Sequence, residues 1–119
     1  MWVVSRYGFF SAVSHRDDEE QVLVRARSRD DLEKLCDLAK GWVREPDVKA
    51  FEPDRIVEIS NADYRYRLIV SADGWREICV AMCDEMDYPN FKNAIAEDDP
   101  ERAHVYLDVW TALRQIQEG

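Results

Sequence analysis

The chain has 119 residues, 46% of them hydrophobic, and a formal net charge of −9. That length suffices for one domain with its own core, and the hydrophobic content argues against a disordered chain. The negative charge disfavours nonspecific binding to DNA, RNA or anionic membranes. It permits binding to a basic partner or mimicry of nucleic acid. We therefore predict a single domain over residues 1–119.

Cysteine usage and hydropathy predict a compartment. The three cysteines have no paired spacing, as expected of a protein from a reducing compartment. The first residues do not resemble a signal peptide, and no apolar run approaches the ~20 residues of a membrane helix. The sequence predicts a cytoplasmic protein that does not bind membranes.

The first half of the chain predicts two strands and a helix. Residues 2–15 have strand composition and predict one long or bent strand, with Gly8 at a bulge or a close approach of another backbone. A charged hairpin tip over 16–20 leads to a second strand over 21–27. Residues 29–40 have helical periodicity.

Signals at its ends define that first helix. Ser28 is in the N-cap position, Asp31 is in the capping-box position and Gly41 is placed as the C′ residue. The connection over 42–54 follows, and Trp42 and Phe51 are expected to anchor it to the core.

The second half predicts two more strands and a helical tail. Strands are expected over 56–60 and 64–70, separated by a turn over 61–63. Ser71 is expected to cap a second helix, and a short helix then begins near Phe91. A last helix over 100–117 starts with an acidic cap and a proline. Two apolar stripes are predicted: Trp75, Ile78, Cys79, Met82 and Met86 on the second helix, and Ala103, Tyr106, Leu107, Trp110 and Leu113 on the last.

This order predicts an α+β fold. Alternating strands favour a four-stranded antiparallel sheet with helices on one face, in the order ββαββα, followed by a C-terminal helical tail. The order is a circular permutation of the ferredoxin-like plait, with the terminal strand moved to the front.

Strand alternation also predicts the candidate site. If Tyr64, Tyr66 and Leu68 face the helices, the opposite face carries four arginines. The candidate residues for binding an anion or a partner are Arg25, Arg27, Arg65 and Arg67. Guanidinium groups suit phosphates and carboxylates and stack on bases. The alternative is that these arginines pair with carboxylates such as Glu58, or that the tail helix covers them.

Other reactive residues do not form a recognisable pattern. Cys36, Cys79 and Cys83 lack the partners of a zinc site, and packing on helices explains them better. His104 and Asp108 are four residues apart, but nothing fixes a catalytic geometry. We therefore predict no catalytic residue, no metal and no cofactor.

Four short motifs stand out when they are taken together. They are Tyr7-Gly8-Phe9-Phe10-Ser11, Asp63-Tyr64-Arg65-Tyr66-Arg67, Asp87-Tyr88-Pro89-Asn90-Phe91-Lys92, and His104-Val105-Tyr106 with Val109-Trp110. In combination they resemble a group of small uncharacterised bacterial proteins. The resemblance implies a bacterial or phage source and no particular function. It also suggests that the polar motif positions form one site. These positions are Tyr7, Asp63, Arg65, Arg67, Asp87, Asn90, Lys92 and His104.

Three functional hypotheses remain open. The first is a non-enzymatic module that binds a protein partner or associates with itself. The second is a module that binds phosphate, a nucleotide or single-stranded nucleic acid, or a nuclease-like enzyme, through the arginine face. The net charge disfavours this second hypothesis. The third is a phage-type inhibitor that mimics nucleic acid through its acidic surface.

Overall fold

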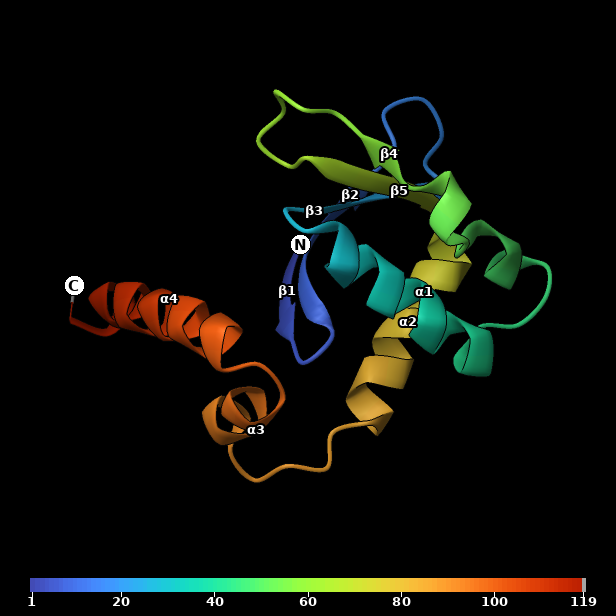
Figure 1. Cartoon of the computed structure of the whole chain (residues 1–119). Coiled ribbons are helices and arrows are strands. Elements are labelled where there is room, and N and C mark those ends of the chain that lie inside the picture. The colour runs from blue at the N-terminus through green and yellow to red at the C-terminus, as the bar shows by residue number, and fades with distance from the viewer. Residues whose placement is uncertain (119) are drawn as a thin grey trace. The chain divides into compact units, whose positions relative to one another are not determined.

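A computed structural model describes residues 1–118 (Figure 1). The chain divides into two compact units, one over Met1–Met86 and one from Asp87 onward. In the described residues, the first unit holds the sheet with helices α1 and α2, and the second unit holds helices α3 and α4.

The first unit is built on an antiparallel sheet of five strands. They lie in the order β1-β2-β3-β5-β4. Their bounds are β1 Trp2–Ser5, β2 Gly8–Ser14, β3 Gln21–Ala26, β4 Val57–Glu58 and β5 Tyr66–Ser71. The α+β class and the antiparallel sheet are confirmed, whereas the predicted count of four strands is wrong.

The additional strand comes from the N-terminal segment. Residues 2–15 form a hairpin of β1 and β2 rather than one long strand, and the chain reverses at Arg6-Tyr7. Gly8 has φ +147°, a conformation that L side chains rarely adopt. A Cβ at this position would lie 2.4 Å from the Asp31 carboxyl carbon. The close approach predicted at Gly8 therefore exists, but a side chain makes it.

Asp31 has a different role from the predicted one. Its side chain is buried and accepts a hydrogen bond from the Phe9 N–H at 3.1 Å. Ser28 is the N-cap residue of α1 (Arg29–Trp42) but makes no side-chain cap bond. The capping box is wrong because the Asp31 carboxylate lies against the start of β2. Gly41 lies inside α1 rather than beyond its end.

Helices α1 and α2 (Ala72–Asp84) pack on one face of the sheet, as predicted. Their apolar stripes meet inward-facing strand residues in one core. Fully buried side chains of that core include Phe10, Val24, Leu32, Leu35, Phe51, Leu68 and Ile78. Two short 3₁₀ helices, η1 (Asp47–Ala50) and η2 (Pro53–Arg55), connect α1 to β4.

The residues that flank α1 and α2 differ in burial. Ser71 caps α2 as predicted and Phe51 anchors the connection, but Trp42 and Met86 are exposed. The Trp42 indole N–H instead donates to the Glu85 carboxylate at 3.2 Å. Tyr66 was expected in the core but is half-buried at its margin.

The second unit is a helix pair, α3 (Phe91–Asp98) and α4 (Pro100–Glu118). Asn90 caps α3, and Asp99 accepts a hydrogen bond from the Arg102 N–H before Pro100 begins α4, as predicted. The Phe91 and Tyr106 rings stack with centroids 5.9 Å apart.

Most of the stripe predicted for α4 stays exposed. Tyr106 is buried, but Leu107, Trp110 and Leu113 are exposed. The eight residues of α3 are too few to cover a helix of nineteen.

Candidate functional site

One face of the sheet carries no helix of the first unit, and we call it the open face. Residues paired directly across strands share a face, so the register identifies its members. One row runs Trp2, Ser11, Arg25, Arg67 and Val57 across the strands, and a second runs Val13, Leu23 and Ile69. Val4 and Phe9, paired across β1 and β2, belong to the same face. Exposed apolar side chains therefore surround two arginines there.

Tyr64 contacts two of the predicted arginines with its ring. The guanidinium carbons of Arg25 and Arg27 are each 4.8 Å from its ring centroid, and the Phe9 ring lies 6.3 Å away. Tyr64 is only 5% exposed. The expectation that Tyr64 faces the helices is wrong, because β5 begins at Tyr66 and strand parity does not hold in the preceding turn. We call Tyr64, Arg25 and Arg27 the Tyr64 cluster.

Hydrogen bonds hold the turn before β5 in place. Arg27 donates to the Asp63 carbonyl at 2.9 Å, and Arg67 donates to the Tyr64 carbonyl at 3.5 Å. Arg67 also lies 3.9 Å from the Asp63 carboxylate, and Arg65 pairs with Glu58 at 2.9 Å. All four predicted arginines thus have contacts within the first unit. The Arg65–Glu58 pair is the one that the alternative hypothesis named.

Arg25 is the most enclosed of the four. It donates from Nη2 to the Ser11 hydroxyl at 2.8 Å, and that serine is itself buried. The Arg25 Nε is a buried donor without a partner among residues 1–118. Because a buried unpaired donor costs free energy, the cation–π contact and the Ser11 bond must offset it.

A groove opens beside the Tyr64 cluster. It has a volume of about 350 Å³ and is lined by Leu23, Arg55, Val57, Arg67 and Ile69. Leu23 and Ile69 are paired across β3 and β5 and share the open face with Arg67. Arg55 was missed because it lies in η2, outside any strand whose alternation could place it.

The two groove arginines differ in their freedom. The side chain of Arg55 is exposed and has no hydrogen bond or ion pair among residues 1–118. Arg67 is 25% exposed and is held by the contacts with Tyr64 and Asp63 described above. The Arg67 guanidinium therefore has partners in the groove wall, whereas the Arg55 guanidinium has none among residues 1–118.

No family model, no curated protein and no solved structure matches this chain. None of the described helices is long and apolar enough to cross a membrane.

The motif positions divide between the two units. Tyr7, Arg65, Arg67 and Asp63 belong to the first unit, where Asp63 and Arg67 come together. The other four, Asp87, Asn90, Lys92 and His104, belong to the second unit.

Structural roles explain two of the positions in the second unit. Asn90 caps α3 by accepting from the Asn93 N–H at 3.0 Å, and the Lys92 ammonium lies 4.7 Å from the Trp110 ring centroid. His104 is exposed on α4.

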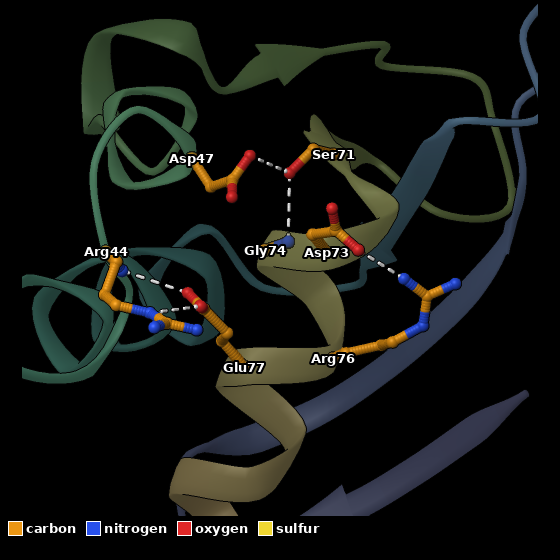
Figure 2. Close-up of polar contacts among 7 residues, drawn as sticks. All are labelled: Arg44, Asp47, Ser71, Asp73, Gly74, Arg76 and Glu77. Carbon is orange, nitrogen blue, oxygen red and sulfur yellow. Dashed lines mark hydrogen bonds and ion pairs between the residues drawn. The ribbon is translucent and has the colours of Figure 1, made fainter.

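A second, polar pocket lies at the N-terminus of α2 (Figure 2). It measures about 530 Å³ and is lined by Arg44, Glu45, Asp47, Asp73, Arg76 and Glu77. The Ser71 hydroxyl accepts from the Gly74 N–H at 2.9 Å and donates to Asp47 at 2.7 Å. A Cβ on Gly74 would lie 3.0 Å from that hydroxyl, so the glycine permits the close approach.

Each charged side chain of this pocket already has a polar partner. Glu77 accepts from both the backbone N–H and the side chain of Arg44 at 3.0 Å, and these bonds hold the pKa of Glu77 below its ordinary value. Arg76 pairs with Asp73 (Figure 2). The network ties the chain after α1 to the start of α2, which is a structural task. We therefore place the candidate site on the open face.

The cysteines offer no reactive centre in the core. Burial raises the pKa of Cys36 to about 11 and that of Cys79 to about 11, so both are protonated at neutral pH. Cys83 is exposed. Among residues 1–118, no three side chains of the metal-binding types come close enough to hold an ion.

Proposed function

We propose that this chain is a non-enzymatic binding module whose open face takes a partner protein segment with apolar side chains and carboxylates. One observation carries the proposal: an apolar groove flanked by Arg55 and Arg67 on an exposed sheet face. The groove lies beside further exposed apolar residues, so its surface is larger than the groove itself. Contiguous apolar surface with a polar rim is typical of interaction sites.

The apolar walls supply nonspecific affinity. Leu23, Val57 and Ile69 line the groove, and the last two are exposed. Each Å² of apolar surface removed from water contributes about 25 cal/mol. A partner that inserts one or two aliphatic or aromatic side chains would therefore gain free energy without any rearrangement of the sheet.

The arginines supply the preference for carboxylates. A guanidinium can donate two parallel hydrogen bonds to one carboxylate, and Arg55 has no competing partner among residues 1–118. The net charge of −9 would repel an acidic partner at long range. At physiological ionic strength that repulsion is screened over about 8 Å, so the local charges decide the contact.

The groove lacks the groups that catalysis needs. Its lining residues include two guanidiniums but no nucleophile, carboxylate or imidazole. Guanidiniums stay protonated in proteins and do not serve as general bases. Binding is therefore the function that this set of side chains supports.

Single-stranded nucleic acid is a second candidate ligand. Trp2 is 73% exposed on the open face and packs edge-on against Phe9, with centroids 5.7 Å apart. Exposed aromatic rings near arginines can stack on bases. The net charge disfavours this ligand, so it enters the experiment as the competing outcome.

The experiment compares three short peptides with the same apolar centre and acidic, neutral or basic flanks, together with an oligothymidylate. Fluorescence anisotropy measures binding to the wild type, to Arg55→Glu and to Arg76→Glu. Arg76 is an exposed arginine on α2, so its reversal is a matched control for charge. We expect the acidic peptide to bind best, Arg55→Glu to weaken it at least about tenfold, and the control to retain it.

Four results would refute the proposal. The first is equal binding of the three peptides, and the second is no binding of any of them. The third is binding of the oligothymidylate alone, which would favour the second candidate. The fourth is an effect of Arg76→Glu as large as that of Arg55→Glu, which would show that net charge, rather than the groove, controls binding.

We also infer that the sheet is a permuted ferredoxin-like plait with one added edge strand. The order β2-β3-β5-β4 with antiparallel neighbours supports this inference, and β1 is then the addition. In such a plait the helices occupy one face, which agrees with an open opposite face.

A further inference from the structure

Strand β1 leaves backbone groups unpaired at the edge of the sheet. The Met1 amine donates to the Ala12 carbonyl at 3.0 Å, and the Ala12 N–H donates back at 2.9 Å. Hydrogen-bonded and non-hydrogen-bonded pairs alternate in an antiparallel ladder. Val3 therefore bonds to β2, whereas the N–H and C=O groups of Trp2 and Val4 point away from it.

A second observation shows which residue pairs between β1 and β2 are hydrogen-bonded. Val4 is paired with Phe9, and the Phe9 N–H points away from β1 to the Asp31 carboxylate. That direction requires Val4 and Phe9 to be a non-hydrogen-bonded pair. The outward backbone groups of Trp2 and Val4 have no partner among residues 1–118.

The two edges of the sheet are not equally protected. The opposite edge strand, β4, has only two residues, and Glu58 in it pairs with Arg65. Strand β1 contains Trp2, Val3, Val4 and Ser5, without a charge or a proline. Charges, prolines and short length are the features that normally prevent strand addition at an edge. Of these three features, β1 has only the short length, four residues.

We propose that β1 pairs antiparallel with β1 of a second copy of this chain, about a two-fold axis at Val3. In this register Trp2 of each copy lies opposite Val4 of the other. Both are outward-facing positions, so each of the two symmetric pairs exchanges two backbone hydrogen bonds. No outward group of Trp2 or Val4 is left unpaired.

The side chains fit the same register. Trp2 and Val4 both belong to the open face, where they are 73% and 38% exposed. Across the two-fold axis each indole would pack on a valine, and pairs of aromatic and β-branched residues stabilise neighbouring strands. Because the same surface patch serves both copies, the interface closes as a dimer. This self-complementarity distinguishes a second copy from an unrelated strand.

Charge sets the strength of the association. Each chain carries −9, so two copies repel one another, yet β1 itself contains no acidic side chain. Repulsion that acts at a distance is reduced by salt, whereas backbone pairing is not. The edge is also short compared with standard interfaces. The dimer is therefore weak, and added salt strengthens it.

Sedimentation velocity between about 10 μM and 1 mM tests the proposal, with salt as a second variable. Val4→Pro removes the outward N–H without touching the bonds of Val3, because proline is tolerated where the N–H faces solvent. Val4→Lys keeps the backbone and adds a charge, and it retains the test if the proline variant does not fold. The control is Val13→Lys, because Val13 is 39% exposed on the same face but lies in β2.

We expect dimers that increase with concentration for the wild type and for Val13→Lys, and at least about tenfold weaker association for both Val4 variants. Amide exchange at Trp2 and Val4 should slow as the dimer forms, while exchange at Val3 changes little. The proposal fails if the wild type is monomeric throughout. It also fails if the Val4 variants dimerise normally or if Val13→Lys dissociates equally. None of these readouts involves the groove, so this test is independent of the proposed function.

Discussion

Replacing Tyr64 tests whether two arginines stabilise the fold through an aromatic ring. The ring is 5% exposed, and the guanidinium carbons of Arg25 and Arg27 are each 4.8 Å from its centroid. A cation–π contact contributes about 0.5–1 kcal/mol at an exposed site and about 2 kcal/mol when it is desolvated. Arg27 is exposed and Arg25 is half-buried, so we assign about 1.5–2.5 kcal/mol to the two contacts together.

Three substitutions separate this term from burial. Tyr64→Phe keeps the ring and removes a hydroxyl that has no partner among residues 1–118, so it should cost less than about 0.5 kcal/mol. Tyr64→Leu keeps an apolar side chain but removes the π face, and should cost about 2 kcal/mol. Tyr64→Ala also leaves a cavity and should cost about 3–5 kcal/mol.

Urea unfolding followed by circular dichroism measures these free energies. A double-mutant cycle of Tyr64→Leu with Arg27→Gln isolates one contact, for which we expect about 0.5–1 kcal/mol of coupling. If Tyr64→Leu is as stable as Tyr64→Phe, or the coupling is zero, the arginines do not stabilise the fold through the ring.

Three further substitutions and one pH dependence follow from the geometry, and the same unfolding assay measures their effects on stability. Gly41 lies inside α1 with open space around it, so Gly41→Ala should stabilise the protein by about 0.5–1 kcal/mol, and a loss would contradict this placement. Gly8→Ala should cost more than about 2 kcal/mol, because its Cβ would collide with Asp31; a neutral result would refute the close approach. Ser71→Ala should cost about 1–2 kcal/mol by removing the cap and the bond to Asp47, whereas the nearby exposed change Asp73→Ala should cost less. The pKa values of Cys36 and Cys79 are raised from 9.0 to about 11, so the free energy of unfolding should fall as the pH rises from about 9 to about 11. In a separate labelling experiment at neutral pH, only Cys83 should react with a thiol reagent.

Local signals predicted much of the first unit correctly. The alternation in residues 21–27 and the cap at Ser71 placed a strand and a helix near their observed bounds. These signals succeed because burial repeats every two residues in a strand and every 3.6 in a helix. The same parity placed Arg25 and Arg67 on the open face, where they are neighbours across β3 and β5.

The failures come from tertiary contacts that periodicity cannot show. Tyr64 precedes its strand by two residues, and its ring packs against the Arg25 and Arg27 guanidiniums instead of following strand parity. Asp31 has the spacing of a capping residue, but the turn at Gly8 brings the Phe9 N–H to its carboxylate. Arg55 enters the groove from η2, which has no strand parity.

The most direct test of the open-face account is an amide chemical-shift titration of the labelled protein with the acidic apolar peptide described above. We predict saturating shifts at Leu23, Val57 and Ile69, the apolar residues of the groove, and their loss in Arg55→Glu. Shifts centred on the polar pocket at Arg44 and Asp47, or shifts that persist in Arg55→Glu, would contradict the claim that the open face is the binding surface.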